Sequence, residues 1–186
     1  MTAVLLLAGC AGPPVEQSAP RPAAKVTGPQ TAALPSPGIP DTSVFARPST
    51  RIVVPAKRQQ CVPYARQVSG IDITGDAWTW WRSAQGRYAT GQRPAVGSVL
   101  VLKRTARLRG GHVAVVTAIL NSREILVDQA NWLNQGQIHI STPVRDVSKN
   151  NDWSAVRVWY IPGDTYGVRT YAAHGFIYSD QVTATR

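Results

Sequence analysis

The chain has 186 residues, which suits one domain of ordinary size with some chain to spare and argues against a protein of two full domains. Hydrophobic residues make up 44% and charged residues 16%, as in globular proteins, and no run of about 18 apolar residues occurs, so we expect no integral membrane fold. Lys and Arg number 20 against 10 Asp and Glu, and the formal net charge of +10 predicts an anionic partner such as nucleic acid, lipid headgroups or an acidic polymer.

The first ten residues have the pattern of a bacterial lipoprotein signal. An apolar run over residues 3–8 leads into Leu7-Ala8-Gly9-Cys10, where small residues before the cysteine suit the cleft of a signal peptidase. We predict cleavage before Cys10, lipidation of its thiol, export across the inner membrane and anchoring at the periplasmic face of the outer membrane. No Lys or Arg precedes the apolar run, which leaves open a start further upstream or a frayed apolar tail.

Residues 11–55 are rich in Pro, Ala, Ser and Thr and show neither helical nor strand periodicity. Such a segment buries too little apolar area to offset its ordering entropy, so we predict a disordered tether. Extended at about 3.1 Å per residue, it would reach on the order of 100 Å. Its last residues, 52–55, predict a short strand leading into the domain.

The composition changes near residue 56, and we predict a domain over residues 56–162 with a C-terminal extension over residues 163–186. The first helix begins at Cys61 and is ended by Gly70. Its apolar face, at helical spacing, consists of Cys61, Tyr64, Ala65 and Val68. Because the positive end of a helix dipole favours thiolate over thiol, we expect the pKa of the Cys61 thiol to be lowered.

A second helix is predicted from Asp76 to Gly86. Helical spacing leaves Trp80 on one side of it and makes a buried stripe of Ala77, Trp78, Trp81 and Ala84. The later apolar runs have the pattern of strands, at residues 98–102, 112–120, 124–132, 137–141 and 156–161. Helices followed by strands predict an α+β domain with an antiparallel sheet.

One histidine begins a predicted strand, and two amides lie on the strand after it. If residues 121–124 form the hairpin turn, Ala114 lies opposite Asn131, and both Gln129 and Asn131 share the face of His112. In that register Asn131 is the diagonal neighbour of the imidazole. The sequence leaves open whether Gln129 or Asn131 orients the ring.

A cysteine at a helix N-terminus, a strand histidine and an adjoining amide are the components of a thiol hydrolase. In this hypothesis His112 takes the proton of the Cys61 thiol and later protonates the leaving amine. The candidate donors to the oxyanion are Gln60 and a nearby backbone N–H. No pair of histidines has the spacing of metal ligands, so we expect neither a metal nor a cofactor.

Five segments carry these residues in order: Gln60-Cys61-Val62-Pro63-Tyr64-Ala65, Gly75-Asp76-Ala77-Trp78, Gly97-Ser98-Val99-Leu100-Val101, Gly111-His112-Val113-Ala114 and Ala130-Asn131-Trp132. Together they resemble the CHAP family, the cysteine, histidine-dependent amidohydrolases and peptidases, over residues 56–162. The resemblance implies a papain-like α+β fold, with N-terminal helices carrying the cysteine packed on an antiparallel sheet carrying the histidine. It also implies hydrolysis of an amide bond in peptidoglycan, by an N-acetylmuramoyl-L-alanine amidase or a cross-link endopeptidase.

By position, the resemblance makes Cys61 the nucleophile, His112 the base and Asn131 a polar member of the catalytic group. Family members often carry Glu where this chain has Gln129, whose amide accepts a hydrogen bond but does not stabilise an imidazolium by charge. The alternative function is therefore a catalytically weak or silent domain that binds the cell wall or serves as a scaffold.

Aromatic and basic side chains near these residues are candidates for substrate binding. Trp132 and Trp80 are candidates to stack on a sugar or a stem peptide. Arg109 belongs to a basic loop that also carries Lys103, Arg104 and Arg107. This loop is interpreted either as a cationic rim that attracts an anionic wall polymer or as an ordinary solvated loop.

We predict no catalytic role for the remaining histidines. We expect His139 to be a partly exposed strand residue and His174 to serve packing. The expected partners are peptidoglycan and, through a lipid on Cys10, a membrane. We expect no nucleic-acid partner, because no recognition motif accompanies the basic charge, and the oligomeric state stays open.

Overall fold

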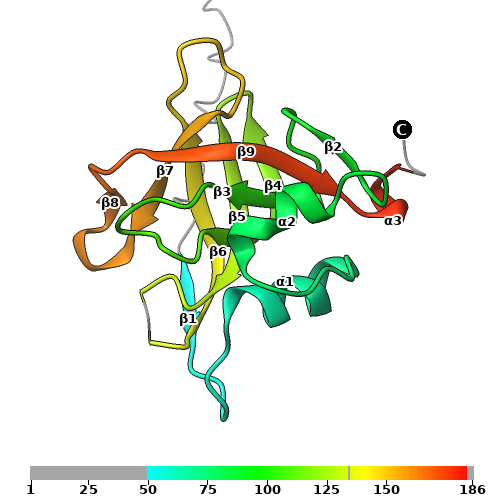
Figure 1. Ribbon diagram of the computed structural model, residues 1–186. Coiled ribbons are helices and arrows are strands. Elements are labelled where there is room, and N and C mark those ends of the chain that lie inside the picture. The colour runs from blue at the N-terminus through cyan, green and yellow to red at the C-terminus, as the bar shows by residue number, and fades with distance from the viewer. Residues whose placement is uncertain (1–49, 134, 184–186) are drawn as a thin grey trace, which may run out of the picture. The chain divides into compact units, whose positions relative to one another are not determined.

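The computed structural model describes residues 50–133 and 135–183. The predicted signal segment, the lipidation of Cys10 and the tether up to residue 49 lie outside the described residues. Within the described part, the helices are short and none combines the length and hydropathy needed to cross a bilayer. Figure 1 shows that strands form the body of this part of the chain, with the helices at its side.

All strand pairs are antiparallel, as predicted, and follow the order β1-β6-β5-β4-β3-β9-β7-β8, with β2 added to β9. An additional pairing between β6 and β7 closes six of them, β6-β5-β4-β3-β9-β7, into a barrel. The strands are β1 (Arg51–Val53), β2 (Ala89–Gly91), β3 (Val99–Leu102), β4 (His112–Asn121), β5 (Glu124–Ala130), β6 (Ile138–Asp146), β7 (Ala155–Tyr160), β8 (Thr165–Tyr166) and β9 (Tyr171–Tyr178).

The predicted papain-like α+β fold is therefore wrong, because the described chain is mainly β and the sheet closes on itself. Two features that periodicity did not reveal cause the closure. The first is β9, which lies in the segment treated as a C-terminal extension and pairs with both β3 and β7. The second is the length of β6, which continues to Asp146 and there pairs with β7.

The first predicted helix is confirmed. Helix α1 (Cys61–Ser69) begins at the cysteine, and Gly70, with φ of 72°, ends it in the left-handed conformation that glycine adopts without strain. Its buried residues are Tyr64, Ala65 and Ser69. Val68, predicted on the buried face, is 45% exposed.

The second predicted helix forms only in part. The segment folds as a 3₁₀ turn, η1 (Ala77–Thr79), followed by the single turn α2 (Trp80–Ser83). This break rotates the apolar face, so that Trp80 is fully buried while Trp78 is 42% exposed. The predicted substrate-stacking role of Trp80 is therefore wrong, because its ring lies in the core. Two further short elements are η2 (Ile161–Gly163) and α3 (Asp180–Thr183).

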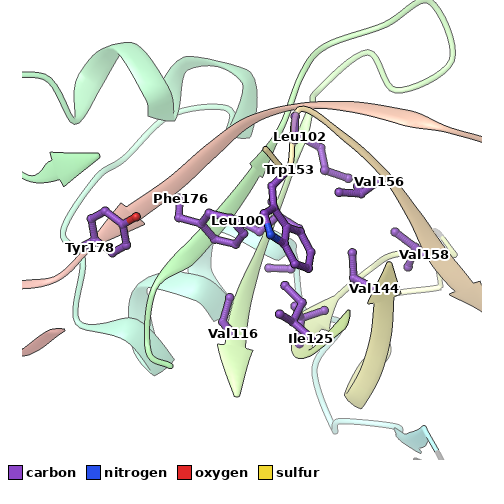
Figure 2. Packing of buried hydrophobic residues seen from close by; sticks show 13 residues of the cluster. Leu100, Leu102, Val116, Ile125, Val144, Trp153, Val156, Val158, Phe176 and Tyr178 are labelled. Atoms are coloured by element: carbon purple, nitrogen blue, oxygen red, sulfur yellow. The ribbon is translucent and has the colours of Figure 1, made fainter. Parts of the chain in front are cut away.

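The alternation of side chains along β3 and β4 separates two cores. Leu100, Leu102, Ala114 and Val116 point into the barrel and pack with residues of the other strands. Figure 2 shows Leu100, Leu102 and Val116 in this cluster with Trp153. The intervening residues Val99, Val101, Val113 and Val115 face outward and pack under α1, η1 and α2. Both faces of these strands are buried, which explains why their sequences are continuously apolar.

Candidate active site

Six of the predicted site residues line one cavity of about 1190 Å³: Gln60, Cys61, Arg109, His112, Asn131 and Trp132. They come from the start of α1, the loop before β4, the start of β4 and the end of β5. Trp80 does not line this cavity. Gln129 is 2% exposed and contacts His112 without forming part of the cavity lining.

Cys61 is the first residue of α1 and is partly buried against the core under the helices. Polar backbone groups of Val113, the residue after His112, of Val62 and of Cys61 itself lie near enough to its sulfur to lower the pKa of the thiol. Burial nevertheless raises the pKa of the Cys61 thiol, and these backbone groups offset the effect only in part. The expectation of a lowered pKa is thus wrong in direction, because loss of hydration outweighs the helix N-terminus.

His112 is the first residue of β4 and is almost fully buried. Gly111 before it has φ of 66°, and a Cβ at this position would lie 2.8 Å from the backbone nitrogen of Trp78. The adjacent Gly110 carbonyl accepts a hydrogen bond of 2.9 Å from that same nitrogen. Glycine at position 111 therefore allows the backbone of η1 to pass directly over the strand that presents the histidine.

Burial lowers the pKa of His112 to about 4; its hydrogen bond to Gln129 raises that pKa, and a positive charge on His139, when that ring is protonated, lowers it further. Since the pKa of the thiol is raised, both groups favour their uncharged forms near neutral pH. The resting pair is a thiol and a neutral imidazole.

Gln129 is the residue that orients the imidazole. His112 Nε2 donates to Gln129 Oε1 over 2.9 Å, which leaves His112 Nδ1 as the acceptor nitrogen. The predicted register is wrong at this end of the hairpin, because two β-bulges intervene between Asn121↔Glu124 and Val115↔Asp128. Together they move the pairing at Val115↔Asp128 by two residues from the predicted one, which keeps Gln129 on the face of His112 and brings its side chain within hydrogen-bond distance of the ring.

Asn131 contacts a different predicted residue. Its Nδ2 donates to Gln60 Oε1 over 2.7 Å, and its Oδ1 accepts from the Gly136 N–H over 2.9 Å. Asn131 itself has φ of 60°, a left-handed conformation that asparagine tolerates better than most residues. Asn131 thus holds the Gln60 amide in place. The oxygen of the Gln60 amide is occupied by this hydrogen bond, and the N–H groups of the same amide are left as donors.

Trp132 packs against the candidate base. Its ring meets the His112 ring edge to face at a centroid distance of 4.8 Å and meets Tyr171 of β9 in the same manner at 5.0 Å. Trp132 is half-buried and also lines the cavity, so it restrains the histidine ring and presents an aromatic wall at once.

The cavity extends to residues that sequence analysis left unassigned. Its far side is formed by β7, β8 and the segment up to Tyr171, including Trp159, Tyr166 and Arg169. The lining carries three arginines, Arg107, Arg109 and Arg169, and among the described residues one carboxylate, that of Asp76. The available signal was the density of aromatic residues after Pro162, but only the barrel brings this segment to the cavity.

The two other histidines differ in environment. His174 stacks on Trp81 with centroids 5.5 Å apart, which agrees with the predicted packing role. The prediction of a partly exposed His139 is wrong, since its side chain is 1% exposed on β6. In the described part of the chain, no three His, Cys, Asp or Glu side chains gather as metal ligands would.

A cysteine and a histidine that share one cavity, with an amide holding the ring, define a site of the cysteine–histidine type. Residues 54–131 match the CHAP domain family model, from the residue after β1 to Asn131. This match confirms, for residues 54–131, the resemblance to the CHAP family, the cysteine, histidine-dependent amidohydrolases and peptidases, that the sequence motifs indicated.

Among solved structures, the chain is similar to an N-acetylmuramoyl-L-alanine amidase from Staphylococcus aureus, with 22% sequence identity and a TM-score of 0.42. The similarity covers 68% of this chain and 36% of that one, so the chain spans little more than a third of that structure. No protein with a curated description matches the chain.

Proposed function

We propose that this protein is a peptidoglycan hydrolase that cleaves an amide bond by a Cys61/His112 thiol mechanism. The observation that carries the proposal is the hydrogen bond from His112 Nε2 to Gln129 Oε1, in a CHAP domain whose Cys61 lines the same cavity. That bond fixes the tautomer in which Nδ1 is free to accept the thiol proton.

In the proposed reaction, the Cys61 sulfur attacks the amide carbonyl carbon as the thiol proton moves to His112 Nδ1. The tetrahedral intermediate collapses when the imidazolium gives this proton to the leaving nitrogen, which departs as an amine and leaves a thioester on Cys61. Water then hydrolyses the thioester, with His112 again as base, and restores the thiol. Because the resting pair is uncharged, proton transfer accompanies the attack rather than preceding it.

The Gln60 amide is the side-chain donor proposed for the oxyanion. Asn131 occupies Gln60 Oε1, so the amide N–H groups are the part of Gln60 left for a substrate oxygen. The arginines that line the cavity match an anionic wall polymer, and the aromatic side chains Trp132, Trp159 and Tyr166 offer surfaces for sugar or peptide.

Purified sacculi test this proposal with the full chain. Wild-type protein should release soluble fragments, and Cys61→Ala should abolish the release, because the thioester then has no sulfur. Cys10→Ala, which removes the chain's other cysteine, is the matched control and should retain the activity in solution. Mass spectrometry of the fragments distinguishes an amidase from an endopeptidase by the new ends. Equal release by the Cys61→Ala variant would refute the proposal.

A second candidate, a wall-binding domain without turnover, is favoured by the raised pKa of Cys61 and by the neutral amide at Gln129. Labelling with iodoacetamide at neutral pH separates the two functions. Stoichiometric labelling of Cys61 in folded protein supports the hydrolase, whereas an unreactive thiol together with retained sacculus binding supports the binding domain.

A further inference from the structure

A second histidine lies on the other side of the amide that holds His112. Strand β5 runs between β4 and β6, and Gln129 of β5 is directly paired with His139 of β6. Directly opposed residues of antiparallel strands have Cβ atoms about 4.5–5.5 Å apart on the same face of the sheet. The Gln129 amide therefore has one imidazole on either side.

Both members of this second pair carry a buried polar atom without a partner. Gln129 is 2% exposed and His139 is 1% exposed. Gln129 Nε2 and His139 Nδ1 make no hydrogen bond to any described residue. Each unpartnered atom is unfavourable in such a place because it has given up its hydrogen bond to water, yet an amide N–H and an unprotonated ring nitrogen complement one another.

We propose that His139 is a positioning residue for His112, and that its Nδ1 accepts a hydrogen bond from Gln129 Nε2 and so fixes the orientation of the amide. The inference rests on the proposed function in one respect, the role of His112 as base. It adds a residue from β6, a strand that follows the segment matched by the CHAP model.

The proposed contact fixes which group donates and which accepts in each hydrogen bond between His139, Gln129 and His112. Gln129 Nε2 donates to His139 Nδ1, His112 Nε2 donates to Gln129 Oε1, and His112 Nδ1 is left to accept from Cys61. If His139 carried its proton on Nδ1 instead, it would donate to Gln129 Oε1 and turn the amide over. The amide would then donate to His112 Nε2, place the histidine proton on Nδ1 and remove the acceptor that the thiol needs.

The surroundings favour the accepting form of His139. Burial lowers the pKa of His139, which keeps the ring neutral near pH 7. Thr142 is the competing partner, because its side chain is also on β6, fully buried, and its Oγ1 likewise makes no hydrogen bond to a described residue. Thr142 pairs with Val127, two residues before Gln129 on β5, whereas His139 lies directly opposite Gln129.

The test is the protonation of the ring nitrogens, read from ¹⁵N chemical shifts of the full chain at neutral pH. In wild-type protein, we expect both His112 and His139 to carry the proton on Nε2 alone. In His139→Leu, which removes the acceptor, His112 should populate the Nδ1–H form and iodoacetamide labelling of Cys61 should slow on the order of 10-fold. His139→Asn, whose Oδ1 replaces Nδ1 as acceptor, should restore both properties.

Thr142→Val and His174→Asn are the matched controls and should leave the His112 tautomer unchanged. A wild-type His139 protonated on Nδ1 would overturn the proposal, and this measurement needs no variant to fold. An unchanged His112 tautomer in folded His139→Leu, or a changed one in Thr142→Val, would also overturn it. None of these readouts needs substrate, so failure to digest sacculi would count against the proposed function and not against the role of His139.

Discussion

At the scale of single residues, burial controls the chemistry of the candidate catalytic pair. The Cys61 thiol has a raised pKa despite its place at a helix N-terminus, and the His112 imidazole has a pKa lowered to about 4. Both shifts arise first from lost hydration, which disfavours each charged form. The identities of the two residues were predictable from the motifs around them, but the direction of the thiol shift was not, because it depends on what covers the sulfur.

The low pKa of His112 predicts a pH dependence of stability. Between its ordinary pKa of 6.5 and the folded value of about 4, the unfolded chain binds a proton that the folded chain does not. The stability due to neutral His112 is complete above pH 6.5 and is lost as the pH falls, by about 3 kcal/mol between pH 7.5 and 4. Urea unfolding of the wild-type and His112→Asn proteins at pH 7.5 and pH 4 measures this loss of unfolding free energy. The same loss in both proteins would contradict the prediction.

At the scale of elements, local sequence decided some features and neighbouring strands decided others. Helix α1 was predictable because its apolar spacing and the capping Gly70 are local signals. The break between η1 and α2 and the two bulges between β4 and β5 were not, since each depends on the surface that the segment packs against. The bulges matter most for the site, because they place Gln129 rather than Asn131 beside the imidazole.

Because η1 crosses closely over the start of β4, we predict that Gly111 cannot be replaced by a residue with a side chain without loss of stability. An added Cβ would lie 2.8 Å from the nitrogen and 2.9 Å from the Cα of Trp78, and the φ of 66° is unfavourable for alanine. We expect Gly111→Ala to lower the free energy of unfolding by about 2–4 kcal/mol and to slow Cys61 labelling by moving His112. Gly110→Ala is the control, because a Cβ there meets no atom within 4 Å, and its cost should stay below about 1 kcal/mol. Similar losses in the two variants would argue against a close crossing.

At the scale of the whole described domain, closure of the barrel joins the two sides of the cavity. Pairing of β9 with β3 and β7, and of β6 with β7, brings the segment from Val158 to Tyr171 against the loop that carries Arg107 and Arg109. Trp153, between β6 and β7, supports this closure from inside, because its ring packs on Phe176 of β9 with centroids 5.7 Å apart (Figure 2).

Truncating this tryptophan tests the closure. Trp153 is 2% exposed, so Trp153→Ala should leave a large cavity and lower the free energy of unfolding by about 3–5 kcal/mol in urea titrations. Val168→Ala, at a side chain 92% exposed, should change it by no more than about 0.5 kcal/mol. A comparably small effect at Trp153 would show that the barrel interior does not depend on that ring.

The amino-acid sequence by itself indicated the resemblance to the CHAP family, the first helix, most strands and the cysteine and histidine of the candidate site, because short motifs and local periodicity carry that information. Only the tertiary structure decided the closed barrel, the burial of Trp80 and His139, the hydrogen bond between His112 and Gln129 and the far wall of the cavity. Each of these depends on contacts between segments far apart in the chain, and a single bulge or one additional strand pairing changes them without altering any local pattern.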